Sequence, residues 1–271
     1  MFSKPMYQIE LKRNLKGNMI WSFALGSMIL MIVAIYPIVK DMMASLVELM
    51  ETMDPSNPFF EIMNDFGGIP TSGIEYFATE GAMILQLVGG IYAAILGFNI
   101  LNKDEKEKTN EVLLTLRISR SKILNAKILA VVTHLFIFTI IQFGLATIGF
   151  VVIDEMSQMG TFWVFGLLNY VMFMVIAFIG LFLAAILKPN QSSFISVAIP
   201  FPLYIITVIA QATNQEFLKS LKYLSPFTFA EPVGFFKTGN NFEWFNFILF
   251  VIISMILTIF AHRLFKKREI I

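Results

Sequence analysis

The stretch NKDEKEKTNEVLLTLRISRSKILNAK, residues Asn102 to Lys127, lies between two long apolar segments and organises the whole chain. A dense charge cluster, Lys103 to Lys108, opens it, and apolar residues with helical spacing follow over Asn110 to Ile118. A Ser hydroxyl can bind the free amides of a helix start, so Ser119 predicts that a new helix begins there. Two interpretations stay open: a helix presented to a soluble partner at a membrane surface, or a solvated loop that only holds topology.

Composition indicates a membrane protein. Hydrophobic residues make up 57% of the 271 residues, charged residues only 14%, and the mean hydropathy is +0.74. No soluble fold has enough interior for so much apolar surface, so we expect an integral membrane protein. The net charge of +1 gives no reason to expect nucleic acid, and the absence of cysteine excludes disulfides and thiolate metal sites.

Apolar segments long enough to cross a bilayer recur six times along the chain. We expect an all-α polytopic membrane protein, a single domain over residues 1–271 with partly helical extracellular segments at 40–79 and 212–241. Pro200 and Pro202 each remove a backbone donor, which predicts a broken or kinked fifth span. The expected transmembrane helices are about 18–39, 81–101, 128–153, 161–187, 192–211 and 242–260.

Residues 3–16 precede the first span and predict an N-terminal interfacial helix. On a helix, Ile9 and Leu11 can face lipid while Lys12 and Arg13 face anionic headgroups. An unstructured basic tail is the alternative. In the second span, Gly89-Gly90 predicts a close approach to another helix.

The distribution of positive charge predicts the orientation in the membrane. Of the 20 Lys and Arg residues, 16 fall in the N-terminal stretch, in 102–127, at Lys188 and in the C-terminal tail. Loops with this bias stay in the cytoplasm, and an even number of spans puts both termini on the same side. We therefore expect a multi-pass protein of the cell membrane with cytoplasmic termini and 102–127 as a cytoplasmic loop.

The sequence has no motif for chemistry of its own. It contains neither a G-x-x-x-x-G-K-[ST] phosphate loop nor an H-E-x-x-H zinc motif. The predicted spans hold almost no ionisable residue, whereas proton- or sodium-driven carriers normally need buried acids. We expect no catalytic residue, no metal and no cofactor on this chain, and an energy source outside it.

Residues 102–127 also resemble the cytoplasmic loop of ABC-2-type ABC transporter permeases. In that family an acidic residue precedes a Gly-Thr-x-Glu-type turn, a Leu-Leu pair, a Ser-Arg pair and a Lys before the next span. Lys108 and Arg117 depart from the pattern, since Gly and Pro are usual there. The matching positions are Glu105, Thr109, Glu111, Leu113, Leu114, Ser119, Arg120 and Lys127.

The resemblance implies a permease subunit whose ATP and Mg are bound by two separate soluble ABC ATPase subunits, together with a second permease, identical or homologous. We expect the loop to couple the two kinds of subunit. In this interpretation apolar side chains fill a groove of the ATPase, and charged ones pair with it and fix the register. The coupling residues would be Glu105, Thr109, Glu111, Leu113, Leu114, Leu116, Arg117, Ser119 and Arg120.

The translocation path would lie between two permeases, lined by the second and fifth spans. Gln86, Asn99, Pro200 and Pro202 are the candidate lining residues, and ordinary interhelical hydrogen bonding is an equally good interpretation of the polar ones.

Methionine- and phenylalanine-rich outer segments favour export of an amphipathic substrate such as a peptide, a drug or a lipid, which would give resistance to antimicrobial peptides. The alternative is a non-transporting scaffold, or an immunity protein that binds a toxin peptide. A cap that packs on the outer ends of the spans is the commoner role of a methionine-rich helix and is the alternative interpretation of the first outer segment.

Overall fold

The computed structural model describes residues 2–52, 68–106, 118–187, 191–211, 213, 215–237 and 242–267, and all the regular structure in them is helical. Six helical segments are long and apolar enough to cross a membrane, as predicted. The long helices are α1 (Lys4–Glu51), α4 (Ala82–Lys106), α6 (Arg120–Val152), α7 (Met159–Ile186), α9 (Pro200–Gln211) and α12 (Trp244–Lys267). The short ones are α3 (Gly73–Tyr76), the π-helical turn η1 (Phe77–Gly81), α8 (Phe194–Val197), α10 (Glu216–Lys219), the 3-10 turns η2 (Ser220–Leu224) and η3 (Pro226–Ala230), and α11 (Pro232–Lys237).

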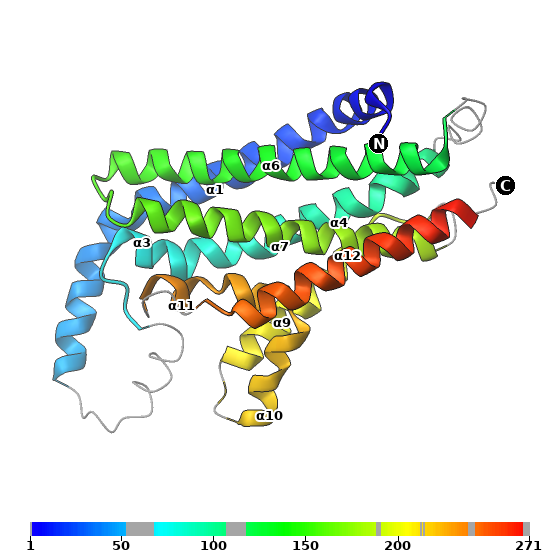
Figure 1. Ribbon diagram of the computed structural model, residues 1–271. Helices are drawn as coiled ribbons and strands as arrows, with labels where there is room; N and C mark the ends of the chain where they lie inside the picture. The colour runs from blue at the N-terminus through cyan, green and yellow to red at the C-terminus, as the bar shows by residue number, and fades with distance from the viewer. Residues whose placement is uncertain are drawn as a thin grey trace.

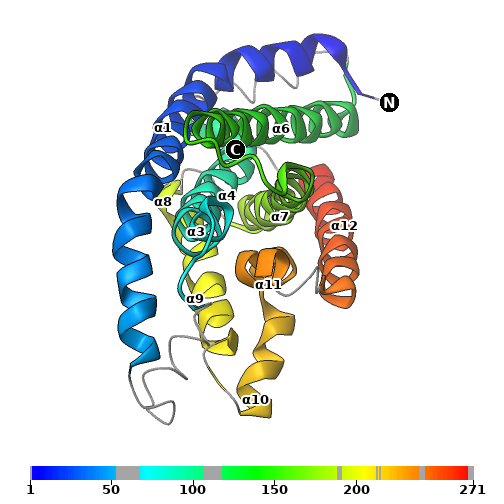
Figure 2. The ribbon, with the colours of Figure 1, turned by 90° about the vertical axis from the view of Figure 1, so that its left-hand side faces the viewer.

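The expected boundary between an N-terminal helix and the first span is wrong, because one helix covers both. α1 is one helix of 48 residues that passes through Gly17 and Pro37 without interruption. A single Gly in a helix costs only about 1 kcal/mol, which tertiary contacts readily offset. Figures 1 and 2 show that the axis of α1 changes direction along its length: its N-terminal part crosses over the bundle, and its last turns leave the bundle.

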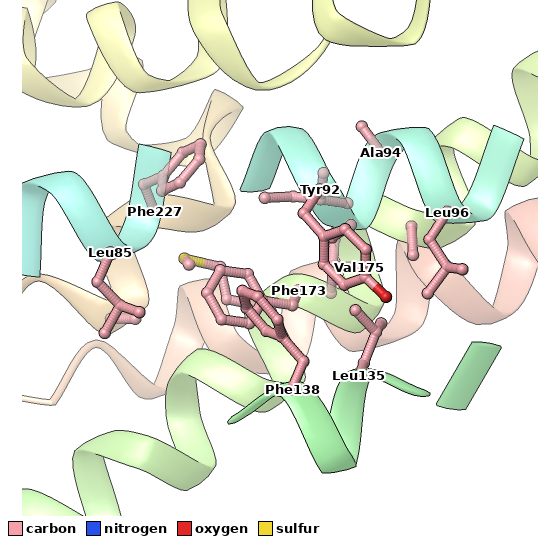
Figure 3. Close-up of a cluster of buried hydrophobic side chains, with 14 of the residues drawn as sticks. Leu85, Tyr92, Ala94, Leu96, Leu135, Phe138, Phe173, Val175 and Phe227 are labelled. Carbon is pink, nitrogen blue, oxygen red and sulfur yellow. The ribbon is translucent and has the colours of Figure 1, made fainter. Parts of the chain in front are cut away.

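The bundle is built around α4, which lies between α1, α6, α7 and α9 when the molecule is seen along the bundle (Figure 2). Aromatic and aliphatic side chains from α4, α6, α7 and η3 fill its centre, among them Tyr92, Phe138, Phe173 and Phe227 (Figure 3). These side chains are almost completely buried. Packing of this kind stabilises helices inside a membrane, because lipid gives no hydrophobic force between them.

Small residues bring the backbones of α4 and α7 into contact. A Cβ atom added at Gly97 would lie 1.9 Å from the Ala177 carbonyl oxygen, and one at Gly180 would lie 2.6 Å from the Ala94 oxygen. At Gly89 and Gly90 the nearest atoms are instead side-chain atoms, such as the Phe173 ring. The predicted close approach of the second span therefore occurs two turns further along the helix than expected.

The fifth span is broken as the two prolines predicted. α8 ends at Val197, α9 begins at Pro200, and the two residues between them form a turn. Beyond α9, residues 216–237 form α10, η2, η3 and α11, so the second outer segment is partly helical. In the first outer segment, the end of α1 and α3 are helical, and residues 53–67 lie outside the described part of the chain.

The bundle has two ends, the loop end and the turn end. The loop end carries the C-terminus of α4, the N-terminus of α6 and the C-terminus of α12. The turn end carries residues 153–158, which join α6 to α7. The start of α1 and the end of α12 both lie at the loop end (Figure 1), as an even number of spans requires.

Candidate functional site: the base of the loop

The structure describes the two ends of the predicted coupling loop. Thr109, Glu111, Leu113, Leu114, Leu116 and Arg117 lie outside the described residues, and Glu105 belongs to α4 with its side chain undescribed. α4 enters the loop at Asn102 to Asp104, and the chain returns through Ile118 and Ser119 into α6. The docking roles of these residues therefore remain predictions. The structure does describe the base of the loop, where the loop joins α4 and α6.

Four charged side chains form a closed ring at this base. Lys127 Nζ lies 2.5 Å from Glu10 Oε1 and 2.5 Å from Asp104 Oδ2. Arg13 completes the ring, with Nη1 2.5 Å from Asp104 Oδ1 and Nη2 3.0 Å from Glu10 Oε2. Cations and anions alternate, and the four formal charges cancel. We call Glu10, Arg13, Asp104 and Lys127 the ionic ring; it joins α1, α4 and α6.

The ring is buried to an unusual degree for charged groups. The side chains of Glu10, Lys127 and Asp104 are 0%, 1% and 3% exposed, and that of Arg13 is 19% exposed. Taking an ion out of water costs several kcal/mol unless partners and hydrogen bonds compensate it. Lys127 is fully compensated, because an ammonium has three donors and its third one reaches the Ile100 carbonyl at 2.8 Å. Removal of any one member would leave a buried charge without a full set of partners.

Hydrogen bonds outside the ring connect α12 and the residue before α1 to the start of α6. Arg120 Nη1 donates to the Lys266 carbonyl of α12 at 2.9 Å. His262 Nε2 lies 2.6 Å from Asn125 Oδ1, and Ser3 N donates to the Lys122 carbonyl at 3.4 Å. Together with the ionic ring, these contacts attach the start of α1, the end of α12 and both described ends of the loop to one another.

The helix start predicted at Ser119 is confirmed, but its predicted mechanism is wrong. Ser119 is the N-cap of α6 in an extended conformation, and its carbonyl accepts from the amides of Lys122 and Ile123. Its hydroxyl makes no capping hydrogen bond. Backbone geometry alone starts this helix.

Of the predicted path residues, Asn99 and Pro200 lie at the interface between α4 and the broken fifth span, and Gln86 of α4 contacts η3 instead. Asn99 Oδ1 accepts from Ser193 Oγ at 2.6 Å, and Pro200 is buried, with its ring near Gly90. Gln86 is 2% exposed and donates to the Ala230 carbonyl of η3, whereas Pro202 is exposed. The two polar residues therefore make the interhelical hydrogen bonds that were the alternative interpretation.

Sequence reasoning missed the ionic ring. Arg13 was expected to face lipid headgroups, and the structure directs it inwards to Asp104 and Glu10. One signal was present: Glu10 is the only acid within the basic stretch 4–16, three residues before Arg13. The remaining members of the ring, Asp104 and Lys127, are distant from Glu10 and Arg13 in sequence, so no local pattern could reveal them. Among the described residues, no group of three or more His, Cys, Asp or Glu could hold a metal ion.

Six apolar helical segments and a charged connection anchored at one end of the bundle define a multi-pass helical membrane protein. The family model of ABC-2 family transporter proteins matches residues 5–270, so the chain belongs to that family. It is an ABC-2 transporter permease component, which lacks the ATPase; ATP is hydrolysed on a partner ABC ATPase subunit. A search of curated proteins found no match.

Proposed function

We propose that this permease is the membrane subunit of an ATP-driven exporter in which two permeases work with two soluble ABC ATPase subunits. The observation that supports this most strongly is the ionic ring, which fixes both ends of the loop 102–127 to α1. A loop that only held topology would need no buried, charge-balanced base.

In the proposed orientation the protein lies in the plasma membrane, and its loop end faces the cytoplasm. The N-terminal stretch, the described ends of 102–127 and the last turn of α12 all lie at that end, and these stretches together hold most of the Lys and Arg residues. Positive charge in short segments is retained in the cytoplasm. The part of α1 that crosses over the bundle in Figure 2 would lie in the membrane interface as an elbow.

Coupling would use two kinds of loop residue. Leu113, Leu114 and Leu116 would fill an apolar groove of the ATPase. Charged and polar residues, namely Glu105, Thr109, Glu111, Arg117, Ser119 and Arg120, would surround them and fix the register. When ATP closes the two ATPase subunits, the loop would move as a rigid body and shift the bundle between two packings.

The substrate path would run between two permeases along the interface of α4 with α8 and α9. Gln86, Asn99, Pro200 and Pro202 lie on the helices of this interface or start them. The fifth span is discontinuous, and its two halves can rearrange more easily than one continuous helix. Aromatic residues at the turn end, including Trp244 and Phe245, are largely exposed and favour an amphipathic substrate such as a peptide, drug or lipid.

The docking part of this proposal is tested by the double variant Leu113→Asp/Leu114→Asp. Purification in mild detergent from cells that express the permease together with its partner ABC ATPase should yield the ATPase with the wild-type chain and lose it with the variant. The matched control is Phe217→Asp/Leu224→Asp, because both side chains are exposed apolar groups in α10 and η2, away from the loop. ATPase retention by the loop variant would overturn the docking assignment. A wild-type chain that captures a toxin peptide and no ATPase would favour an immunity protein instead.

A further inference from the structure

We propose that the ionic ring is the joint that makes the N-terminal part of α1 move with the loop, and that Glu10, Asp104 and Lys127 are positioning residues of this joint. The inference rests on the proposed function, because it assigns a path for movement that starts at the ATPase. It concerns residues on the base of the loop and none of the residues assigned to docking.

The ionic ring closes the loop at its base. Asp104 is on the helix that enters the loop and Lys127 on the helix that leaves it, and their side chains touch directly at 2.5 Å. Two ends joined by a buried ion pair cannot separate or slide without leaving a buried charge without its partner. A displacement of the loop therefore reaches α4 and α6 together, and is not absorbed by bending where the loop meets the bundle.

The ionic ring also attaches α1 to both helices that carry the loop. Both acids of the ring are bridged by Lys127 and by Arg13, so α1 is held to α4 through Arg13 and to α6 through Glu10. The Glu10 carboxylate also accepts from the side chain of Asn14, one turn further along α1. Nearby, Tyr7 OH lies 2.9 Å from Thr133 Oγ1, which adds a second contact between α1 and α6.

α12 contacts the start of α6 through hydrogen bonds at less buried positions. Its described polar links to the start of α6 are the hydrogen bonds of Arg120 and His262, at exposed or half-buried positions. Buried charged hydrogen bonds are stronger and less screened than exposed ones. The geometry thus makes α1 part of the moving body with α4 and α6, and leaves α12 more loosely attached.

The joint can be opened without leaving a net charge in the ring. In Asp104→Asn/Lys127→Met one acid and one base are removed together, and Glu10 keeps Arg13 as its partner within α1. In Glu10→Gln/Arg13→Met the contact between Asp104 and Lys127 remains, so the loop stays closed while the ionic attachment of α1 to α4 and α6 is removed. The matched control is Lys222→Met/Glu243→Gln, which removes a half-exposed ion pair of 2.8 Å far from the loop.

The test is amide hydrogen exchange of the purified complex of permease and ATPase, with and without ATP and vanadate. In the wild type and the control, we expect nucleotide to change the exchange rate of residues 4–16 and of residues 118–127. In both ring variants the ATPase should stay bound in the same amount and 118–127 should still respond, while the response of 4–16 is lost. A merely structural role would not separate these two segments. An unchanged response of 4–16 in either folded ring variant would overturn the proposal.

Amide hydrogen exchange measured on the permease without the ATPase distinguishes a failure of this proposal from a failure of the proposed function. Opening the ring should speed the exchange of residues 4–16 by roughly tenfold or more, the factor expected from losing one charged hydrogen bond. Equal exchange in the ring variants and the wild type would contradict the joint even where the ATPase binds. If the wild-type chain binds no ATPase, the proposed function fails, and the faster exchange would still show that the ring holds α1.

Discussion

Gly97→Ala should weaken the contact on which the centre of the bundle depends. The added methyl carbon would lie 1.9 Å from the Ala177 carbonyl oxygen and 2.6 Å from the Ala177 carbonyl carbon. Ordinary contact begins near 3.4 Å, so α4 and α7 would have to move apart by about 1.5 Å at this point. Both obstructing atoms belong to the backbone and cannot rotate away. The reciprocal contact of Gly180 with Ala94 would be disturbed as well.

The expected loss of stability follows from two opposing effects. Overpacking of a core costs about 1–3 kcal/mol, and a backbone obstruction belongs at the upper end of that range. Replacing Gly by Ala inside a helix regains about 1 kcal/mol. The net loss is about 2 kcal/mol, which corresponds to a fall in Tm of about 4–8 °C for a chain of this size.

The assay is the fraction of permease that stays monodisperse in detergent after heating to a series of temperatures. The matched control is Gly144→Ala in α6, where the added methyl carbon would meet no atom within 4 Å. That substitution should leave the midpoint unchanged or raise it. If Gly97→Ala unfolds at the same temperature as Gly144→Ala, or at a higher one, the described contact between α4 and α7 is wrong.

Three further predictions concern polar groups. Lys127→Met alone leaves two buried acids with one cation and should cost about 3–5 kcal/mol in the same heating assay, whereas the balanced change Asp104→Asn/Lys127→Met should cost less. Gln86→Leu removes the hydrogen bond from α4 to the Ala230 carbonyl and should lower stability by about 1 kcal/mol. Burial raises the pKa of the Glu231 carboxyl above its ordinary 4.5, although the amides of Gly234 and Val233 oppose the shift. The folded state therefore holds this proton more tightly than the unfolded state, and stability should fall as pH rises from 4.5 through the raised pKa. Glu231→Gln should remove that fall in a series of Tm measurements at different pH values.

The spans were predictable because they depend on local composition. α7 begins and ends within two residues of the predicted fourth span, and the break before Pro200 follows from the chemistry of proline alone. The continuous course of α1 was not predictable. Its charge pattern indicates a helix apart from the first span, whereas the structure has one continuous helix whose residues Glu10 and Arg13 contact α4 and α6.

The candidate site was likewise predictable only in part. Lys127 and Arg120 could be singled out from the pattern of the loop, but the partners they have in the structure come from other helices. Lys127 meets Glu10, 117 residues away in sequence, and Arg120 meets Lys266, 146 residues away. Contacts of this range depend on how helices pack, and no spacing within one segment encodes them. The docking roles assigned within 107–117 remain predictions.

The central claim is that residues 102–127 touch an ABC ATPase, and lysine cross-linking of the purified complex followed by mass spectrometry tests it most directly. Lysines occur in two separate segments of the sequence: Lys103, Lys106, Lys108 and Lys122 within residues 102–127, and Lys219 and Lys222 within residues 216–224. We predict cross-links from the first group to the ATPase and none from the second. Cross-links to the ATPase from Lys219 or Lys222, with none from the loop, would contradict the account.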